Sequence, residues 1–202
     1  MRHAIVFDLE FTAWPGSMEH RWRRPGEFRE VVQIGAVKID AATLEEVDSF
    51  NLLAKPRLNP ELSPYFEKLT GVTNARLAES GIDFADAYRA FIAFANGTPI
   101  FSFGRDDRVL VDNLALYGLN AMPPLPPCTN IALWLADHGV DPRGLHACDI
   151  ARAAGAAFEG RRHDALDDAR SVALGIATLV ARGAPSPFAI RPFATSAFMA
   201  PP

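Results

Sequence analysis

"IVFDLEFTAW", residues 5–14, has the composition of a buried β-strand but carries two carboxylates. The remaining residues are mostly branched or aromatic, as is typical of a central strand. Asp8 and Glu10 are two positions apart, so both side chains project from the same face. Burying a charge is costly unless it is paired or binds a metal. Either this strand ends at the surface, or its two carboxylates hold a cation.

The order of the other segments predicts one mixed α/β domain. Strands are expected at 3–11, 30–40 and 45–56, and their short connections predict an antiparallel meander. A meander followed by alternating helices and strands favours a mixed sheet covered by helices. The later segments predict a short strand at 98–104 and helices at 63–71, 84–97, 106–118, 131–139, 147–155 and 164–183.

Two segments fall outside this pattern. Residues 12–29 contain two prolines and two glycines among polar side chains, which predicts a long surface loop. Residues 184–202 are rich in proline and phenylalanine without periodicity, with Phe188, Phe193 and Phe198 among them. We therefore expect a domain over 1–183 and a C-terminal tail over 184–202 that lies outside the core.

The composition of the 202 residues narrows the classes of protein. Hydrophobic residues make up 49% and charged residues 22%, which is typical of a globular domain. No apolar run approaches the roughly 18 residues of a membrane span, and the N-terminus predicts no signal peptide. The net charge of −4 does not by itself indicate nucleic-acid binding. Two cysteines without metal-ligand spacing predict a reduced, cytoplasmic protein.

Acidic residues recur at two later places. "FGRDD" puts Asp106 and Asp107 directly after a short strand, at the start of a helix. "HDALDDA" puts His163 five residues before Asp168, at the start of the last helix. Each Asp taken singly is explained as a helix cap. The ordered combination with the D-x-E strand is far less expected by chance, and it indicates a metal-binding catalytic set.

These motifs resemble those of the DEDDh 3′→5′ exonucleases, and the resemblance spans residues 3–182. It implies an α/β, ribonuclease H-like fold with a mixed five-stranded sheet flanked by helices. Two features resemble the motifs of the RNA-trimming branch of that family most closely: the spacing in "FGRDD" and the segment "LTGVT". The matching positions are Asp8 and Glu10 in "FDLEFT", Asp107 in "FGRDD" with Asp106 as the alternative register, and His163 and Asp168 in "HDALDDA".

The resemblance also implies a catalytic role for each residue. Two Mg²⁺ or Mn²⁺ ions are expected, because carboxylate oxygens suit hard cations. Asp8 would contact both ions, Glu10 and Asp168 the ion that carries the attacking water, and Asp107 the second ion. His163 would take the proton from that water, since an ordinary histidine pKa of about 6.5 suits a base near neutral pH. The expected reaction releases nucleoside 5′-monophosphates.

The expected partner is the single-stranded 3′ end of RNA or DNA. Bases would stack on aromatic side chains and the backbone would meet basic ones. Phe11 and Leu69 have a second interpretation as core residues, and "HRWRRPG" (20–26) is either a phosphate contact or a solvated basic loop. The residues predicted to contact substrate are Phe11, Thr12, Trp14, Leu69 and Arg162.

Two other functions fit part of the pattern. A non-catalytic nucleic-acid-binding module would keep the fold but need not keep all five catalytic positions. A haloacid-dehalogenase-type phosphatase uses a D-x-D-x-T motif, which "DLEFT" approaches, but here Glu10 stands at the second position and lysines are scarce. The sequence leaves the oligomeric state open, and a homodimer is compatible with it.

Overall fold

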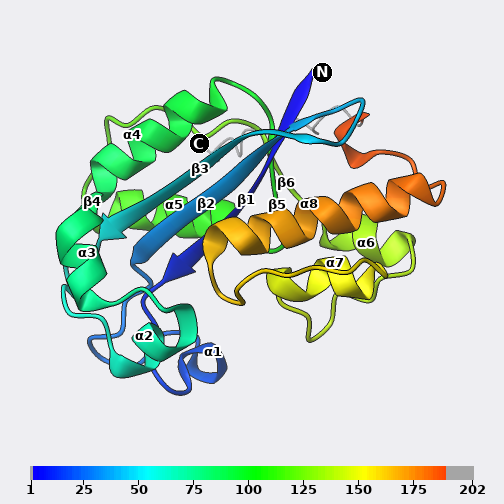
Figure 1. The fold of residues 1–202 in the computed structure, drawn as a ribbon. Coiled ribbons are helices and arrows are strands. Elements are labelled where there is room, and N and C mark those ends of the chain that lie inside the picture. Colours follow the sequence, from blue (N-terminus) through cyan, green and yellow to red (C-terminus); the bar gives the residue numbers. More distant parts are fainter. Residues whose placement is uncertain (1, 190–202) are drawn as a thin grey trace, which may run out of the picture.

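The computed structural model describes residues 2–189, which form a six-stranded sheet with helices on both faces (Figure 1). The strand order is β4-β3-β2-β1-β5-β6. β2 pairs antiparallel with β1 and β3, and the remaining neighbours pair parallel. The strands are β1 (His3–Phe11), β2 (Val31–Asp40), β3 (Glu46–Lys55), β4 (Ile82–Asp83), β5 (Ile100–Ser102) and β6 (Cys128–Asn130).

The mixed sheet and its antiparallel meander are confirmed, but the expected number of five strands is wrong. β4 has two residues and β6 has three, so neither is long enough to show an alternating pattern in the sequence. β6 also follows a proline-rich connector, which hides it further. Both short strands lie at the edges of the sheet.

The segments predicted to be helical are helical, and shorter by a few residues at their ends. Two helices were not predicted: α1 lies within the expected loop 12–29, and α3 follows α2 directly. The start of α3 has a recognisable cap, because the Thr73 hydroxyl accepts a hydrogen bond from the backbone N–H of Arg76. The helices are α1 (Ser17–His20), α2 (Pro64–Thr70), α3 (Asn74–Ser80), α4 (Phe84–Ala95), α5 (Asp106–Leu116), α6 (Ala132–Asp137), α7 (Ile150–Ala153) and α8 (Ala165–Ala181), with 3₁₀ helices η1 (Ala147–Asp149) and η2 (Pro187–Ala189).

The central strand β1 separates two apolar layers. Ile5 and Phe7 pack in the layer that contains α4, whereas Ala4 and Val6 pack in the layer that contains α8. Alternation along the strand puts Asp8 and Glu10 in the same row as Ala4 and Val6. The two carboxylates therefore face α8, where the apolar row ends.

A glycine in β2 lets α8 approach this end of the sheet. Gly35 pairs with Asp8 across the antiparallel ladder. A Cβ atom on Gly35 would lie 2.1 Å from the backbone nitrogen of Leu166 in the first turn of α8. Any other residue at this position would push the helix away. The start of α8 is thus held directly over the carboxylates of β1.

The first residues of the expected tail pack on the domain. Phe188 is buried, and its ring centroid lies 5.0 Å from that of Phe101 in β5. The indole N–H of Trp134 donates to the carbonyl of Pro185 at 3.1 Å. Phe193 and Phe198 lie outside the described residues. Within residues 2–189, none of the helices combines the length and apolar character needed to cross a bilayer.

Candidate active site

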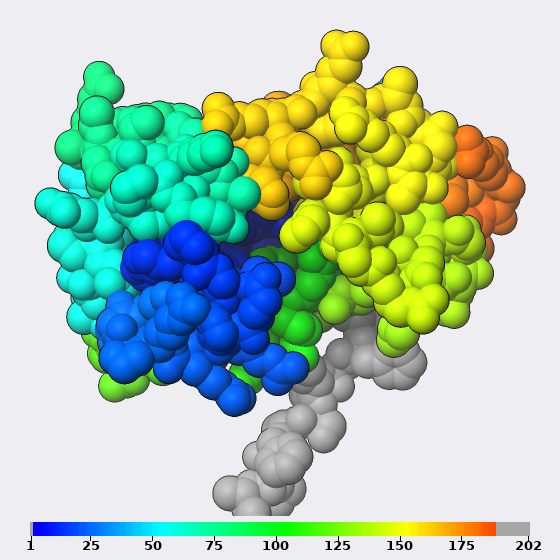
Figure 2. Space-filling view, turned by 90° about the horizontal axis from the view of Figure 1, so that it is seen from below, coloured from blue at the N-terminus to red at the C-terminus, as the bar shows by residue number. Residues whose placement is uncertain are grey.

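Four acidic side chains meet where β1 ends. Asp8 and Glu10 come from β1, Asp106 is the first residue of α5, and Asp168 lies in the first turn of α8. Each is less than a tenth exposed. They line a cleft of about 990 Å³ together with His163. Figure 2 shows this hollow between the N-terminal segment in blue and the later segments in yellow and orange.

The structure brings Asp106, not Asp107, into this group. Asp106 lines the cleft, and its negative charge raises the pKa of both Asp8 and Glu10. Asp107 instead accepts two hydrogen bonds from the guanidinium of Arg105, at 3.0 and 3.1 Å. Consecutive residues of a helix point about 100° apart, so only one of the two can face the cleft. The register predicted from the sequence is therefore corrected by one residue.

β2 fixes the position of Asp168 through the start of α8. Asp164 is the N-cap of the helix and accepts from the backbone N–H groups two and three residues later. The fully buried side chain of Gln33 donates to Asp164 Oδ2 at 3.0 Å and accepts from the backbone N–H of Ala165 at 3.1 Å. Asp168 follows one turn later. The amide of Gln33 thus ties the carboxylate of α8 to the sheet.

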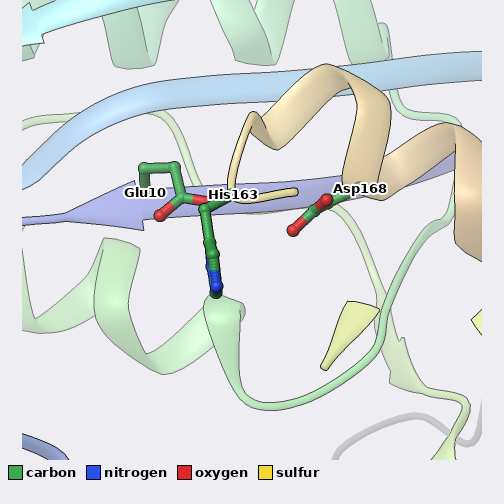
Figure 3. Close-up of side chains that lie close together, drawn as sticks. All are labelled: Glu10, His163 and Asp168. Carbon is green, nitrogen blue, oxygen red and sulfur yellow. The ribbon is translucent and has the colours of Figure 1, made fainter. Parts of the chain in front are cut away.

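His163 precedes α8 in a left-handed backbone conformation, with a φ of 58°. One ring nitrogen and one carboxylate oxygen each from Glu10 and Asp168 all lie within 4.8 Å of one another. Figure 3 shows the imidazole projecting between these two carboxylates. The ring centroid of His146 lies 5.5 Å away, and His146 also lines the cleft. Sequence reasoning missed His146, because no motif surrounds it.

Burial and crowding shift the pKa values of these groups. Burial, and then the neighbouring carboxylates, raise the pKa of Asp8 and of Glu10 well above the usual range. Burial raises the pKa of Asp106 and of Asp168 to about 7. Burial, and then the neighbouring His146, lower the pKa of His163. At neutral pH the imidazole is therefore uncharged and can accept a proton.

The donor set fits divalent cations. Asp168 Oδ1 is buried without a hydrogen-bond partner in the part of the chain that the structure describes. Among residues 2–189, no basic side chain forms an ion pair with any of the four carboxylates. Buried carboxylates without such partners are expected to bind metal, and their oxygens suit Mg²⁺ and Mn²⁺.

Three of the predicted substrate contacts line the cleft: Phe11, Trp14 and Leu69. Thr12 does not. Its side chain is buried. Its hydroxyl donates to the carbonyl of Phe28 and accepts from the backbone N–H of Glu30. In the structure Thr12 therefore holds the two ends of the 12–29 segment together and does not face the cleft.

Arg162 is not among the residues that line the cleft. Its guanidinium forms an ion pair with Asp149, which in turn accepts from the backbone N–H of His146 at 3.1 Å. Arg162 thereby links the loop before His163 to the loop that carries His146. The contact of Arg162 with substrate stays a prediction.

Residues 12–29 form one wall of the cleft, through Trp14, Met18, Arg21, Trp22 and Arg29 among others. Sequence reasoning predicted a surface loop here, and the three arginines and the tryptophan in "HRWRRPG" were the signal that this loop contributes to the site. The indole N–H of Trp22 donates to the carbonyl of Thr12 at 2.7 Å. Its ring packs edge-on against Phe11 at 5.3 Å.

Comparisons with known proteins agree with this fold. A family model described as an exonuclease matches residues 5–174, and no curated protein matches the chain. The nuclease domain of 3′hExo, a DEDDh family member bound to rAMP, has a TM-score of 0.76 at 23% identity, over 91% of this chain and 94% of that chain. Cell-death related nuclease 4 has a TM-score of 0.73 at 19% identity, over 91% of this chain and 65% of that chain. E. coli Exonuclease I in complex with a dA16 oligonucleotide has a TM-score of 0.65 at 16% identity, over 91% of this chain and 42% of that chain.

Proposed function

The chain belongs to the exonuclease family, and from this premise we propose a metal-dependent 3′→5′ exonuclease that acts on single-stranded ends. Its products would be nucleoside 5′-monophosphates, released one at a time from RNA or DNA. The observation that carries the proposal is an oxygen of Asp168 that is buried without a partner among residues 2–189, next to three further buried carboxylates.

Asp8, Glu10, Asp106 and Asp168 would hold one or two Mg²⁺ or Mn²⁺ ions. Bound ions of this kind stabilise the negative charge that develops on the phosphodiester and lower the pKa of water. The four side chains come from β1, α5 and α8. Both helices contact β2, which pairs with β1 in the sheet. Their geometry is therefore set by the sheet and does not depend on a mobile loop.

His163 is the proposed general base. Its lowered pKa keeps the imidazole neutral at pH 7, so a ring nitrogen can take the proton of an attacking water. The ring stands next to Glu10 and Asp168, where such a water would meet the phosphodiester. The ion pair of Arg162 with Asp149 would hold the loop before His163 in place.

Aromatic side chains in the cleft would hold the 3′-terminal nucleotide. Phe11 and Trp14 offer surfaces on which a base stacks, and Leu69 on α2 lies on the same cleft. Such stacking tolerates every base, so the proposed enzyme has no sequence preference.

The two cysteines are unpaired in the structure, and a cytoplasmic location remains our prediction.

The experiment that tests this function uses 5′-labelled single-stranded RNA and DNA, each with and without a complementary strand. We expect Mg²⁺ or Mn²⁺ to give a ladder that shortens from the 3′ end, with single strands degraded faster than duplexes. The variant Asp8→Ala removes a metal ligand and is expected to lose this activity. Normal turnover by folded Asp8→Ala would falsify the metal-site assignment.

The variant His163→Ala separates catalysis from binding. It is expected to lose most of the rate while still binding metal and oligonucleotide. If the wild-type protein binds oligonucleotides but leaves them intact with Mn²⁺ present, the protein is a binding module and the proposed reaction is wrong.

A further inference from the structure

The outer side of the 12–29 segment carries a second hollow next to the cleft. Its volume is about 490 Å³. Glu19 and Arg21 line both this hollow and the cleft, so the two lie next to each other. Although the chain has a net charge of −4, this hollow is predominantly basic. Its lining residues are Glu19, His20, Arg21, Arg23 and Arg24.

The segment that forms this hollow is held in a defined conformation. Arg21 and Trp22 are consecutive residues with positive φ, at 54° and 53°. This conformation is unfavourable for residues other than glycine, and it persists only where surrounding contacts fix it. Here the Trp22 indole N–H bonds to the carbonyl of Thr12, and the guanidinium of Arg29 lies 5.6 Å from the Trp22 ring. Arg21 is the C-cap of α1, and this conformation places it beside the cleft that it lines.

The arginines of the hollow differ in how their charges are compensated. Arg24 donates to the carbonyl of Pro15 at 3.1 Å and lies 3.8 Å from the carboxylate of Glu27. Arg21 and Arg23 are exposed, and neither forms an ion pair with any residue from 2 to 189. Two uncompensated guanidinium groups on a loop that these contacts hold are well suited to bidentate contact with phosphate.

We propose that this hollow is a second binding site, which holds the phosphodiester backbone of the substrate strand several nucleotides on the 5′ side of the terminal residue. The inference rests on the proposed function, because it assumes that the 3′ end lies in the cleft. Because Glu19 and Arg21 line both hollows, a strand that leaves the cleft would pass directly onto this one, which favours the same strand as the occupant over a separate acidic partner. Arg21 stands where the strand leaves the cleft, and Arg23 lies farther along its path.

The site predicts that substrate length controls affinity. Short oligonucleotides fill the cleft alone, whereas longer ones also reach Arg21 and Arg23. KM should therefore fall as the substrate grows from about two to about twelve nucleotides, and then level off. Each lost phosphate contact should reduce the slope of log KM against log salt concentration by about 0.7 for a single strand.

The test compares wild type with the double variant Arg21→Gln/Arg23→Gln across this series of oligonucleotides. We expect KM for the longest oligonucleotide to rise roughly ten-fold, and the dependence on length and on salt to flatten. Arg89→Gln is the matched control, because Arg89 is an exposed arginine on α4, which packs against the other face of the sheet from α8. Its profile should equal that of wild type.

Two single variants guard against a folding defect. Arg23→Gln alone should show part of the effect, and Arg23→Lys, which keeps the charge, should restore most of the length dependence. The proposal is overturned if the double variant retains the wild-type dependence of KM on length and salt. It is also overturned if wild type shortens oligonucleotides with a KM that does not change with length. The proposed function fails separately, by the absence of any metal-dependent shortening.

Discussion

Two buried carboxylate sites in this protein are completed in opposite ways. Glu30, directly before β2, is fully buried, and the chain itself satisfies it. Its carboxylate accepts from three consecutive backbone N–H groups, those of Arg57, Leu58 and Asn59, each at 2.7 Å. It also accepts from the hydroxyl of Tyr117. A charge with this many donors is stable without any ligand.

Within residues 2–189, the cluster around Asp8 has no comparable set of donors. In the same part of the chain an oxygen of Asp168 is buried without a partner, and the neighbouring carboxylates repel one another. The side chains of both sites are less than a tenth exposed, so burial alone does not distinguish them. The difference lies in the donors that the fold supplies, and it separates a structural carboxylate from one that needs a cation.

We call the cluster around Asp8 the open site, and Glu30 with its donors the closed site. The largest expected effect tests which of the two aspartates at the start of α5 belongs to the open site. Asp106→Asn should lower kcat by roughly 10³-fold or more, because it removes a carboxylate that faces the cleft. Asp107→Asn is the matched control and should retain most of the activity, since Asp107 pairs with Arg105. Exonuclease assays on both purified variants decide this. Equal losses in the two variants would contradict the register of the structure.

Changing the closed site should affect stability and leave catalysis intact. Glu30→Gln replaces a charged acceptor by a neutral amide that faces four donors. We expect the free energy of unfolding to fall by about 1.5–3 kcal/mol. Urea unfolding measures this loss, and activity per folded molecule should stay near that of wild type. A large fall in kcat with unchanged stability would show that Glu30 takes part in the reaction.

Gln33 connects the sheet to the open site, so its loss should have an intermediate effect. Gln33→Met removes the amide that holds Asp164 and the start of α8. We expect activity or Mn²⁺ affinity to fall about 10- to 100-fold, which a titration of rate against Mn²⁺ concentration measures. Asn51→Ala removes the other partner of Gln33 and serves as the control. Equal activity of Gln33→Met and wild type would rule out this positioning role.

The open site was largely predictable because its chemistry leaves a mark in the sequence. The D-x-E spacing in β1 predicts two carboxylates on one face, and His163 and Asp168 flank the start of a strongly periodic helix. Asp106 was assigned less well because two adjacent aspartates begin α5. The structure decides between them, because Asp106 lines the cleft whereas Arg105 binds Asp107.

The closed site could not be predicted. The partners of Glu30 lie 27 to 29 and 87 residues away, and three of them are backbone groups that carry no side-chain signature. The same holds for Gln33, whose contacts with Asp164 and Ala165 span more than 130 residues. β4 and β6 were missed because strands of two or three residues show no period.

The open site should also make the metal-free protein sensitive to pH. The pKa of Asp106 and of Asp168 rises from 3.8 to about 7 on folding. Between about pH 4 and about pH 7 the folded state therefore binds more protons than the unfolded state, so the free energy of unfolding falls as pH rises. Thermal melts in chelator from pH 5 to pH 8 should show this decline. Saturating Mg²⁺ should reduce it, because the ions replace the protons.

The most direct test of the account is the melting temperature of wild type and Asp8→Asn at pH 8, each with chelator and with Mn²⁺. We predict that the metal-free variant melts higher than metal-free wild type, because one of the mutually repelling carboxylates is gone. Mn²⁺ should raise the Tm of wild type by about 3 °C or more and that of Asp8→Asn by less. A wild-type Tm that Mn²⁺ leaves unchanged, or shifts equally in both proteins, would contradict the claim that this carboxylate cluster is completed by metal.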